Sequence, residues 1–308
     1  MALLDEVNAL IYSQIKEWPQ AATGFGALQS VQTRDISVPG MDVRVQFNPA
    51  RMVSTGAKID AASVKARKCF LCEANRPEVQ RGIAWGDHYT ILVNPFPIFP
   101  RHLTIPDDSH ILQQIKGRIC DMVQLSMDLE GYTIFYNGPK CGASAPDHMH
   151  FQAGNSDFLP LWNAIENDSL KTVAKESDAT LSISCCLPFN VFVIEGNSSH
   201  DCEALFDRLY AALPQQEDET EPMMNVLCRA IAGRIELVVI PRKKHRPSFY
   251  GTDEGCMVLS PASVDLGGVF ITPRAEDYAN LDSSTVQKVY DELCLSLEEI
   301  KEITKRLN

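Results

Sequence analysis

The sequence predicts an α+β protein in which antiparallel sheets are flanked by helices and the chain falls into two similarly built halves. Short stretches with strand-like alternation recur along the 308 residues, and segments with helical periodicity separate them. Gly, Pro and Asn clusters interrupt these stretches, as turns do. A strand also ends at an Ile-Pro pair in each half, at Ile105-Pro106 and at Ile240-Pro241. We therefore expect a first half over residues 1–185 and a second, divergent half over residues 186–308.

Two helices and several strands are expected in the first half. Apolar residues between positions 3 and 15 recur at helical spacing, which predicts a helix over residues 2–17. The same spacing between positions 111 and 123 predicts a helix that continues to about residue 130. Strands are expected at residues 43–47, 89–93, 102–106, 132–136 and 149–152.

The second half repeats this pattern more loosely. Strands are expected at residues 191–194 and 236–240, with a helix over 202–213 and an exposed acidic loop over 214–222 between them. A capping box at residues 284–287 is expected to begin a final helix. We expect that helix to bury the stripe formed by Val289, Leu293, Leu297, Ile300 and Ile303.

Composition excludes several functional classes. Hydrophobic residues make up 45% of the chain, which suffices for one large or two modest cores. A formal net charge of -12 argues against a nucleic-acid backbone as partner, because such binding needs clustered Lys and Arg. The sequence has no run of about 18 apolar residues, and residues 1–6 lack a secretory pattern. We expect a cytoplasmic protein without a membrane segment.

The ten cysteines do not form the pattern of a disulfide framework. Such frameworks belong mainly to small secreted domains, whereas this chain is long and includes the adjacent pair Cys185-Cys186. Most of the cysteines are therefore expected to be reduced thiols.

The most informative segment is His148-Met149-His150-Phe151-Gln152. Successive side chains on a strand point to opposite faces, so His148, His150 and Gln152 should share one face while Met149 and Phe151 enter the core. Such a polar face can simply meet solvent. Because the segment follows a Gly- and Pro-containing loop at residues 137–142, we interpret the face as a site that receives an anion.

Three segments together resemble the histidine triad superfamily, namely residues 94–102, 103–106 and 148–152. Within it they are similar to the His-x-His-x-Gln branch, which includes galactose-1-phosphate uridylyltransferase, diadenosine tetraphosphate phosphorylase and GDP-hexose phosphorylases. Residues 136–153 are most similar to the GDP-hexose phosphorylase type, and residues 48–72 to the uridylyltransferase. The resemblance covers residues 45–160 and implies a HIT-like antiparallel sheet with flanking helices, present twice.

The resemblance implies nucleotidyl transfer or phosphorolysis. A nucleoside diphosphate sugar or a dinucleoside polyphosphate would be the donor, and phosphate or a sugar phosphate the acceptor. His150 holds the middle position of the motif and would carry the nucleotide covalently. An unperturbed histidine titrates near pH ~6.5, so a neutral ring is available, and a carbonyl bonded to one nitrogen would fix its tautomer. Gln152 can donate to a phosphoryl oxygen but cannot deliver a proton, which favours transfer over hydrolysis.

Further residues are expected to contact the substrate. Ser144 holds the position of the corresponding family residue, and backbone amides around Gly142 could cradle a distal phosphate. Asn94 could contact the ribose or base side, although Asn before Pro is also a plain turn signal. Mg²⁺ could assist at the phosphates, but no pair of carboxylates requires it.

Basic residues could supply charge to the phosphates. Lys140, Arg51 and Lys58 are candidates, and each also fits an ordinary surface position. Residues 242–246 form the one dense basic run of the chain, which fits a solvated loop or a clamp for the acceptor phosphate. Arg101 stands where the family commonly has glycine before His102, so it could aim charge at the ligand instead.

Cys69 and Cys72 have the spacing of a tetrahedral zinc site. The resemblance implies that His110 and His148 complete the set, and that a structural Zn²⁺ anchors the strand carrying His150. A redox pair or plain buried thiols are the alternatives, and GDP-hexose phosphorylases need not carry this metal. His88 and His200 lie in no motif and are expected at the surface.

Two other functions stay open at this point. The chain could be a nucleotide hydrolase of the same superfamily, or a zinc-stabilised nucleotide-binding protein without catalysis. The two halves could form one pseudo-dimer within the chain, and a homodimer is also compatible with the sequence.

Overall fold

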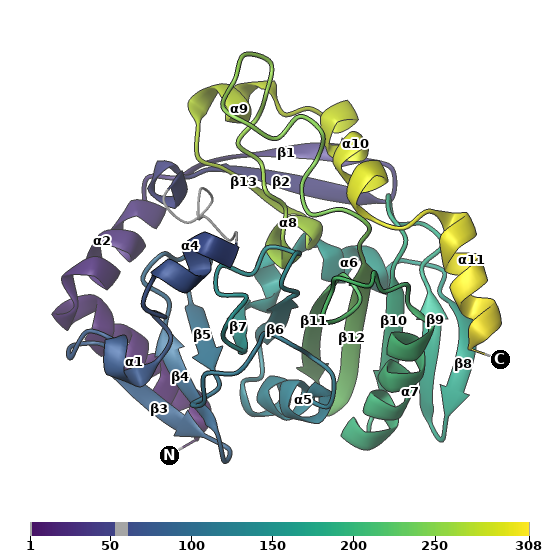
Figure 1. Ribbon diagram of the computed structural model, residues 1–308, viewed down its shortest axis with the longest axis horizontal. Coiled ribbons are helices and arrows are strands. Elements are labelled where there is room, and N and C mark those ends of the chain that lie inside the picture. The colour runs from purple at the N-terminus through teal and green to yellow at the C-terminus, as the bar shows by residue number, and fades with distance from the viewer. Residues whose placement is uncertain (1, 53–60, 308) are drawn as a thin grey trace.

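The fold is built on one ten-stranded antiparallel sheet, and the computed structural model in Figure 1 describes residues 2–52 and 61–307. Its strand order is β3-β4-β5-β7-β6-β11-β12-β10-β9-β8. The strands are β3 (Gly82–Trp85), β4 (Tyr89–Val93), β5 (His102–Pro106), β6 (Tyr132–Asn137), β7 (His150–Asn155), β8 (Lys171–Glu176), β9 (Ala179–Ile183), β10 (Phe192–Gly196), β11 (Met224–Ile231) and β12 (Arg234–Pro241).

The strand order is the same when it is read inward from either edge of the sheet. The first set runs β3-β4-β5-β7-β6 and the second β8-β9-β10-β12-β11, and the two sets join where β6 pairs with β11. A helix follows the third strand of each set, α5 (Ile119–Asp128) in the first and α7 (Ser199–Ala212) in the second. The predicted α+β fold with a large antiparallel sheet and flanking helices is therefore confirmed. The sequence-based boundary at residues 185 and 186 falls after β9, and a division into domains at that point stays a prediction.

A second, three-stranded sheet covers part of the large one. It contains β1 (Gln32–Val38), β2 (Met41–Phe47) and β13 (Val269–Thr272), so it brings the N-terminal and C-terminal regions together. Figure 1 shows it above the large sheet, while α5 and α7 lie below. The remaining helices are α1 (Leu3–Glu17), α2 (Pro19–Leu28), α4 (Ala61–Ala66), α6 (Pro160–Glu166), α8 (Ser263–Leu266), α9 (Ala275–Asn280), α10 (Ser283–Leu293) and α11 (Leu297–Arg306), with short 3-10 turns η1 (Pro49–Arg51), η2 (Glu73–Asn75) and η3 (Ser156–Phe158).

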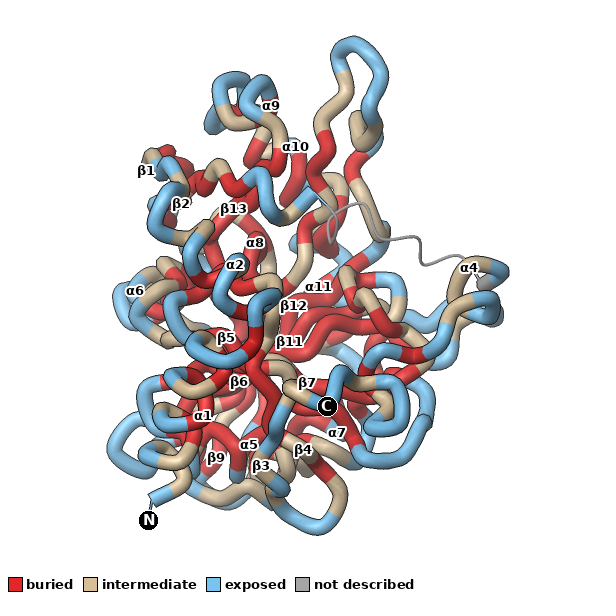
Figure 2. Tube along the Cα trace, turned by 90° about the vertical axis from the view of Figure 1, so that its left-hand side faces the viewer, coloured by how far each residue is buried: buried red, intermediate tan, exposed pale blue. Residues whose placement is uncertain are grey.

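Alternation along the strands fills a separate core on each face of the large sheet. Phe135 packs with the small sheet, α6 and α10, whereas the next residue, Tyr136, packs with α1, α5 and α7. The two clusters are the main hydrophobic cores of the described residues, and Figure 2 shows that buried segments run mainly through the strands. This double burial explains why strands such as β6 are apolar on both faces rather than alternating with polar residues.

The helix predicted from residue 111 is shorter than expected. Residues 111–117 precede α5 as irregular chain, so Ile111 and Leu112 are exposed instead of buried. Gly117 has a φ of +73°, which ends any helical path, and the backbone N–H of Ile115 donates to the Glu221 carboxylate at 3.0 Å. Residues 111–117 therefore have helical spacing of apolar residues, but hydrogen bonds to a distant part of the chain hold them in an irregular conformation.

The predicted final helix is in fact two helices, α10 and α11. Cys294 forms an isolated β-bridge with Arg242 between them, and Ser296 caps α11 in a capping box with Glu299. The cap of α10 is Asp282, whose side chain accepts from the Thr285 N–H at 2.8 Å, so the expected capping box at residues 284–287 was wrong. The predicted stripe is buried except for Leu297, which is exposed.

Other expectations on burial and covalent structure have mixed outcomes. The loop over residues 214–222 was expected to be exposed, yet Glu221 is buried and accepts from the Tyr136 hydroxyl at 2.5 Å. Strands β1, β3, β8, β9, β11 and β13 were not anticipated.

All ten cysteines lie in the described part of the chain and are free thiols. No described helix combines the length and the apolar character needed to cross a membrane.

Candidate functional site

A cavity of about 710 Å³ lies between the first strand set and loops from the second half. Strand β7 lines it with His150 and Gln152, and the loop after β6 lines it with residues 142–144. The second half contributes His245, Arg246, Ser260 and Asp265. The volume falls within the range of about 300–1,000 Å³ that is usual for small-molecule sites.

His150 presents an unprotonated ring nitrogen to this cavity. Its Nδ1 lies 2.8 Å from the carbonyl oxygen of His148. A carbonyl can only accept, so Nδ1 carries the proton, and Nε2 of the neutral ring keeps its lone pair. Burial lowers the pKa of His150 to about 4, against the raising effect of the His148 carbonyl. The ring is therefore neutral at neutral pH, and its tautomer is the one that the sequence analysis required of a nucleophile.

Gln113 fixes the backbone on which His150 sits. Its side-chain oxygen accepts from the His150 N–H at 2.8 Å, and its amide nitrogen donates to the carbonyls of His150 and Asn137 at 3.1 and 3.0 Å. Gln113 is fully buried, so the amide bridges the ends of β6 and β7 without competition from water. Sequence reasoning missed this residue because it placed residue 113 inside a helix.

The amide of Gln152 is oriented by His102. The N–H of Ile98 donates to His102 Nδ1 at 3.1 Å, so the proton of the neutral ring sits on Nε2. Nε2 in turn donates to Gln152 Oε1 at 3.1 Å. Burial, aided by the charge of Arg51, lowers the pKa of His102 to about 3 and keeps this ring neutral as well. With its oxygen engaged, Gln152 has its amide N–H groups to offer to a ligand.

Asn94 supports the same arrangement. Its side-chain nitrogen lies 3.0 Å from the Thr104 hydroxyl oxygen and 3.5 Å from Gln152 Oε1, while its oxygen accepts from the Phe96 N–H at 2.8 Å. The structure therefore brings Asn94 to the cavity beside Gln152. Its bond to Phe96 also makes it the turn residue that the Asn-Pro sequence indicated.

The loop that carries Gly142 and Ser144 is anchored on the second half. Gly142 has a φ of +100°, and a Cβ there would lie 2.4 Å from the Cβ of Ala262. Only glycine allows the loop to lie this close to Ala262. Both Gly142 and Ser144 line the cavity, as does Ala143 between them.

Charged groups reach the cavity from several elements. Arg51 lines it and donates to the carbonyl of Phe96. Desolvation lowers the pKa of Arg51 to about 10, although Asp265 opposes the shift, so the guanidinium stays charged at neutral pH. Arg246 donates to the Ser260 hydroxyl at 2.9 Å and stacks over the Tyr250 ring at 4.1 Å. Burial raises the pKa of Asp265 to about 6, although two backbone N–H groups hold its carboxylate.

The basic run at residues 242–246 is neither wholly solvated nor wholly part of the cavity. His245 and Arg246 line the cavity, whereas Lys243 and Lys244 are exposed and face Glu299 and Glu292. Arg242 is buried and donates to Asn225 Oδ1 at 2.7 Å.

Two of the basic residues considered in the sequence, Lys140 and Arg101, are described but do not line the cavity. Lys140 pairs with Asp218 and Glu219 at 3.2 Å each and lies beside a separate cavity of about 170 Å³. Arg101 is exposed and does not occur among the described residues that line the larger cavity. Lys58 lies outside the described residues. Arg67, which the sequence analysis did not single out, does line the cavity and pairs with Asp147 at 2.5 Å.

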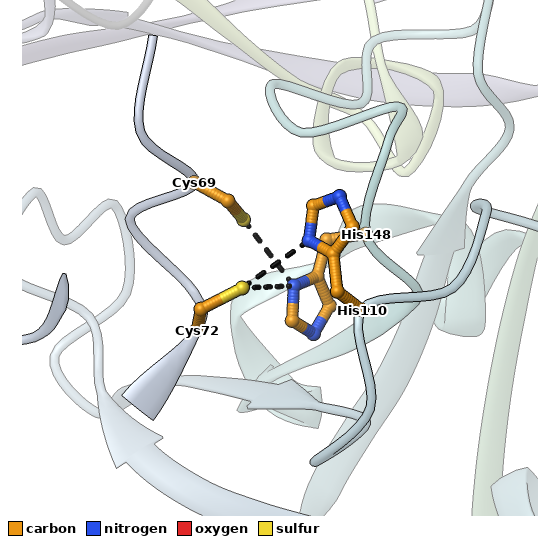
Figure 3. A group of neighbouring side chains, drawn as sticks. All are labelled: Cys69, Cys72, His110 and His148. Carbon is orange, nitrogen blue, oxygen red and sulfur yellow. Dashed lines mark hydrogen bonds between the residues drawn. The ribbon is translucent and has the colours of Figure 1, made fainter. Parts of the chain in front are cut away.

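Cys69, Cys72, His110 and His148 form a compact cluster, shown in Figure 3. Cys69 Sγ lies 3.2 Å from His148 Nδ1, and Cys72 Sγ lies 3.2 Å from His110 Nδ1. His148 Nε2 donates to the carbonyl of Asp107 at 2.7 Å, so its Nδ1 lone pair faces the thiols. Burial raises the pKa of Cys69, but hydrogen bonding to His148 and nearby amides outweighs this and lowers it to about 6.

The cluster has the donor set of a tetrahedral metal site. Bonds of ~2.3 Å to sulfur and ~2.0 Å to nitrogen place the two donor atoms about 3.5 Å apart. The sulfur-to-nitrogen distances of 3.2, 3.2 and 3.5 Å are close to that separation. Two sulfurs and two imidazole nitrogens could therefore hold one metal ion without rearrangement.

This placement corrects one expectation about the motif. His148 was expected to share a wall with His150 and Gln152, but β7 begins only at His150. The His148 N–H bonds to the carbonyl of Ala145 at 3.1 Å in a turn, which directs the His148 ring into the cluster. His150 and Gln152 do line one wall, and Met149 and Phe151 enter the core as predicted.

Two family models match successive parts of the chain. Residues 10–155 match the family model described as Domain of unknown function (DUF4922), and residues 164–307 match the model described as GDPGP1-like, C-terminal domain. No curated protein sequence matches the chain.

Solved structures of yeast Ap4A phosphorylase Apa2 are similar over nearly the whole chain. One has a TM-score of 0.56 at 18% identity and covers 90% of this chain and 93% of its own. The complex with AMP has a TM-score of 0.55 at 20% identity, covering 92% and 97%. The complex with Ap4A has a TM-score of 0.55 at 16% identity, covering 90% and 96%. At these identities the similarity establishes a shared fold.

The neutral His102 predicts a pH dependence of stability. Its folded pKa of about 3 lies below the unfolded value of ~6.5, so between these values the unfolded chain binds a proton that the folded protein does not. The free energy of unfolding should therefore rise with pH in this window. In His102→Asn the slope between about pH 4 and 6 should be smaller by up to about 1.4 kcal/mol per pH unit. Urea denaturation at several pH values measures it.

His88→Asn is the matched control, because the His88 side chain is 44% exposed and lies outside the cavity. Parallel slopes for the parent and His102→Asn would contradict the assignment of a neutral, buried His102.

Proposed function

We propose that this chain, which has the HIT-like fold of the galactose-1-phosphate uridylyltransferase and Ap4A phosphorylase branch, is a nucleotidyltransferase that works through a covalent nucleotide on His150. One observation carries the proposal. His150 Nδ1 is bonded to the His148 carbonyl at 2.8 Å, which leaves a neutral Nε2 at the wall of a nucleotide-sized cavity. A neutral nucleophile suits a phosphoanhydride, whose negative oxygens repel an anionic one.

In the first step, Nε2 of His150 attacks the α-phosphorus of the donor. The new N–P bond forms as the bond from phosphorus to the leaving phosphate oxygen breaks, and the leaving group departs as a phosphate ester or nucleotide that needs no proton. The ring becomes positively charged, with its proton still on Nδ1. The carbonyl of His148 stabilises that charge through the same hydrogen bond.

In the second step, an oxyanion of the acceptor phosphate attacks the same phosphorus and the N–P bond breaks, which returns the lone pair to Nε2. Gln152 supports both steps by donating its amide N–H groups to the phosphoryl oxygens, an orientation that its bond to His102 favours. No group with an acidic proton is required, because the leaving group and the attacking group are both phosphates.

Phosphates of donor and acceptor need positive charge around them. We assign this role to Arg51 and Arg246, which line the cavity, together with the backbone of the Gly142 to Ser144 loop. Asp265 is the one carboxylate among the described lining residues, and backbone N–H groups already hold it. A Mg²⁺ ion, where it takes part, would therefore be held mainly by the phosphates themselves.

The donor is proposed to be a nucleoside diphosphate sugar or a dinucleoside polyphosphate, and the acceptor phosphate or a sugar phosphate. The complexes of yeast Ap4A phosphorylase with AMP and Ap4A support a nucleotide in a fold of this kind. The match of residues 164–307 to the GDPGP1-like model supports the inclusion of GDP-sugars among the donors.

We also propose that the cluster of Cys69, Cys72, His110 and His148 holds a structural Zn²⁺. Zinc prefers this donor set, and zinc-bound imidazoles typically donate their other ring N–H to a carbonyl, as His148 does to Asp107. The ion would fix the turn that precedes His150, and it would take no part in the chemistry.

Trapping the intermediate tests the proposed function. The protein should be incubated with radiolabelled GDP-, UDP- and ADP-sugars and diadenosine polyphosphates, then denatured in alkali. We expect label on the protein that is stable to alkali and lost in acid, as a phosphorus–nitrogen bond would be. His150→Ala should carry no label, whereas His88→Asn should label like the parent, because His88 lies outside the cavity.

Adding inorganic phosphate or hexose 1-phosphate should discharge the label into a new nucleotide product. Turnover that is indifferent to both acceptors would instead identify a hydrolase. Retention of nucleotide binding without label from any donor would identify a non-catalytic nucleotide-binding protein.

Gln152→His should shift the partition of the intermediate from transfer toward hydrolysis. Histidine at this position can exchange protons at neutral pH, whereas the amide of Gln152 cannot. We expect the ratio of hydrolysis to transfer to rise by about tenfold or more. Product analysis at fixed phosphate concentration measures the ratio. Gln152→Ala serves as the control, since it removes the donor without adding an acid and should slow both reactions together.

Zinc at the cluster predicts a loss of both metal and stability in Cys72→Ser. The variant should retain one fewer equivalent of zinc than the parent, and its melting temperature should fall by about 5–10 °C, because an ion that binds only the folded state stabilises it. Metal analysis and thermal unfolding measure the two effects. Cys185→Ser, at an exposed thiol, should change neither. Equal zinc content in the parent and Cys72→Ser would contradict the assignment.

A further inference from the structure

A second group of metal-ligating side chains lies between helices α5 and α7. Cys120 Sγ is 3.1 Å from Glu203 Oε2 and 3.6 Å from His200 Nδ1, and the three donor atoms lie within 4.8 Å of one another. None of the three lines the cavity that holds His150. Sequence analysis placed His200 at the surface with no role, and Cys120 and Glu203 belong to no motif.

The donors come from two neighbouring helices, Cys120 from α5 and His200 and Glu203 from α7. Cys120 stands in the first turn of α5. His200 lies in the first turn of α7, and Glu203, three residues further along, is on the same face of that helix. The helices pack against each other, as Figure 1 shows at the lower face of the sheet. Because α5 belongs to the first strand set and α7 to the second, this group bridges the two repeats.

Two hydrogen bonds hold the Glu203 carboxylate next to Cys120. Its Oε1 accepts from the backbone N–H of Cys120 at 3.3 Å, and its Oε2 accepts from the Cys120 thiol at 3.1 Å. The carboxylate thus points at the sulfur rather than at solvent. An ion bound here would take the place of the thiol proton, and the carboxylate would need little movement to join it.

The distances and donor types fit a zinc-like ion. A tetrahedral ion with ~2.3 Å bonds to sulfur and ~2.0 Å bonds to nitrogen separates these atoms by about 3.5 Å, close to the 3.6 Å between Cys120 and His200. One thiol, one imidazole and one carboxylate suit Zn²⁺ better than Mg²⁺ or Ca²⁺, which favour oxygen ligands alone. His200 is exposed and the other two are partly exposed, so an ion has a path to the site.

We propose that Cys120, His200 and Glu203 form a second metal site, which takes a divalent ion of the Zn²⁺ class and links the two repeats across α5 and α7. Binding forms a metal–sulfur bond at Cys120, and the displaced thiol proton goes to solvent. Three protein ligands leave one coordination position open to water, unlike the four-ligand cluster of Cys69, Cys72, His110 and His148. The site is independent of the proposed nucleotidyl transfer.

The experiment compares zinc binding by the parent, His200→Asn and Cys120→Ser, using equilibrium dialysis against Zn²⁺ followed by metal analysis. Each variant should hold one fewer equivalent than the parent. His200 is exposed, so its substitution should leave folding intact even where Cys120→Ser destabilises α5. Cys185→Ser is the matched control and should bind as much zinc as the parent.

A second readout needs no variant of the thiol. Zn²⁺ should slow alkylation of Cys120 by N-ethylmaleimide by about tenfold or more, as followed by peptide mass mapping, because a metal-bound thiolate is not free to react. A chelator should restore the rate, His200→Asn should lose the protection, and Cys72→Ser should keep it. Unchanged zinc content in His200→Asn, together with alkylation of the parent that Zn²⁺ does not slow, would overturn the proposal.

Discussion

The hydrogen bond from His150 Nδ1 to the carbonyl of His148 is the interaction on which the proposed site depends. It fixes the tautomer of the buried ring, leaves the lone pair on Nε2 of a residue that lines the cavity, and offers an acceptor for the charge that would develop on the ring. The side chain of His148 belongs to the Cys/His cluster, while its carbonyl accepts from His150, the proposed nucleophile. One residue therefore joins the candidate metal site to the reacting atom. Any interaction that fixes the turn at His148 therefore also fixes the orientation of the His150 ring.

A buried polar path extends this constraint into the second half. Arg242 donates to Asn225, Asn225 donates to Asn137, and the carbonyl of Asn137 accepts from Gln113, whose oxygen accepts from the His150 N–H. All five residues are buried, so each group would lose a partner if one were removed. The pairing of β6 with β11 places Asn137 opposite Asn225 at the centre of this path. The second half thus helps to position His150, the proposed nucleophile, although it carries no His-x-His of its own.

Local patterns predicted the parts of the fold that local physics decides. Alternation in residues 149–152 placed Met149 and Phe151 in the core, and the order of apolar segments yielded the antiparallel α+β architecture. The failures arose where distant groups control the backbone. Residues 111–117 have helical spacing, yet Glu221 from another loop takes the N–H of Ile115. The sequence likewise gives no indication that Gln113 bridges β6 and β7, because this role depends on the two strands meeting beside it.

The candidate site shows the same division. The spacing of Cys69 and Cys72, together with the resemblance, predicted that these two cysteines, His110 and His148 would lie together, and the four side chains do so. Charge was harder to place. Lys140 lies near Ser144 in the sequence, but its ammonium group forms ion pairs with Asp218 and Glu219 of an acidic loop. Arg246, more than a hundred residues away, reaches the cavity because a loop of the second half folds over it.

The two strand sets contribute different residues to the cavity and its surroundings. β12 holds the place in the second set that β7 holds in the first, but its Leu237, Val238 and Val239 are all buried in the hydrophobic cores. In the second set this position is therefore filled by core packing instead of a polar wall. The segment after β12 supplies Arg242 to the buried path and Arg246 to the cavity. The proposed reaction uses a single imidazole, and the pairing of β6 with β11 joins the strand set that carries it to the second set. His150 is thus held directly by the His148 carbonyl and Gln113, and indirectly, through the buried polar path, by residues of the second repeat.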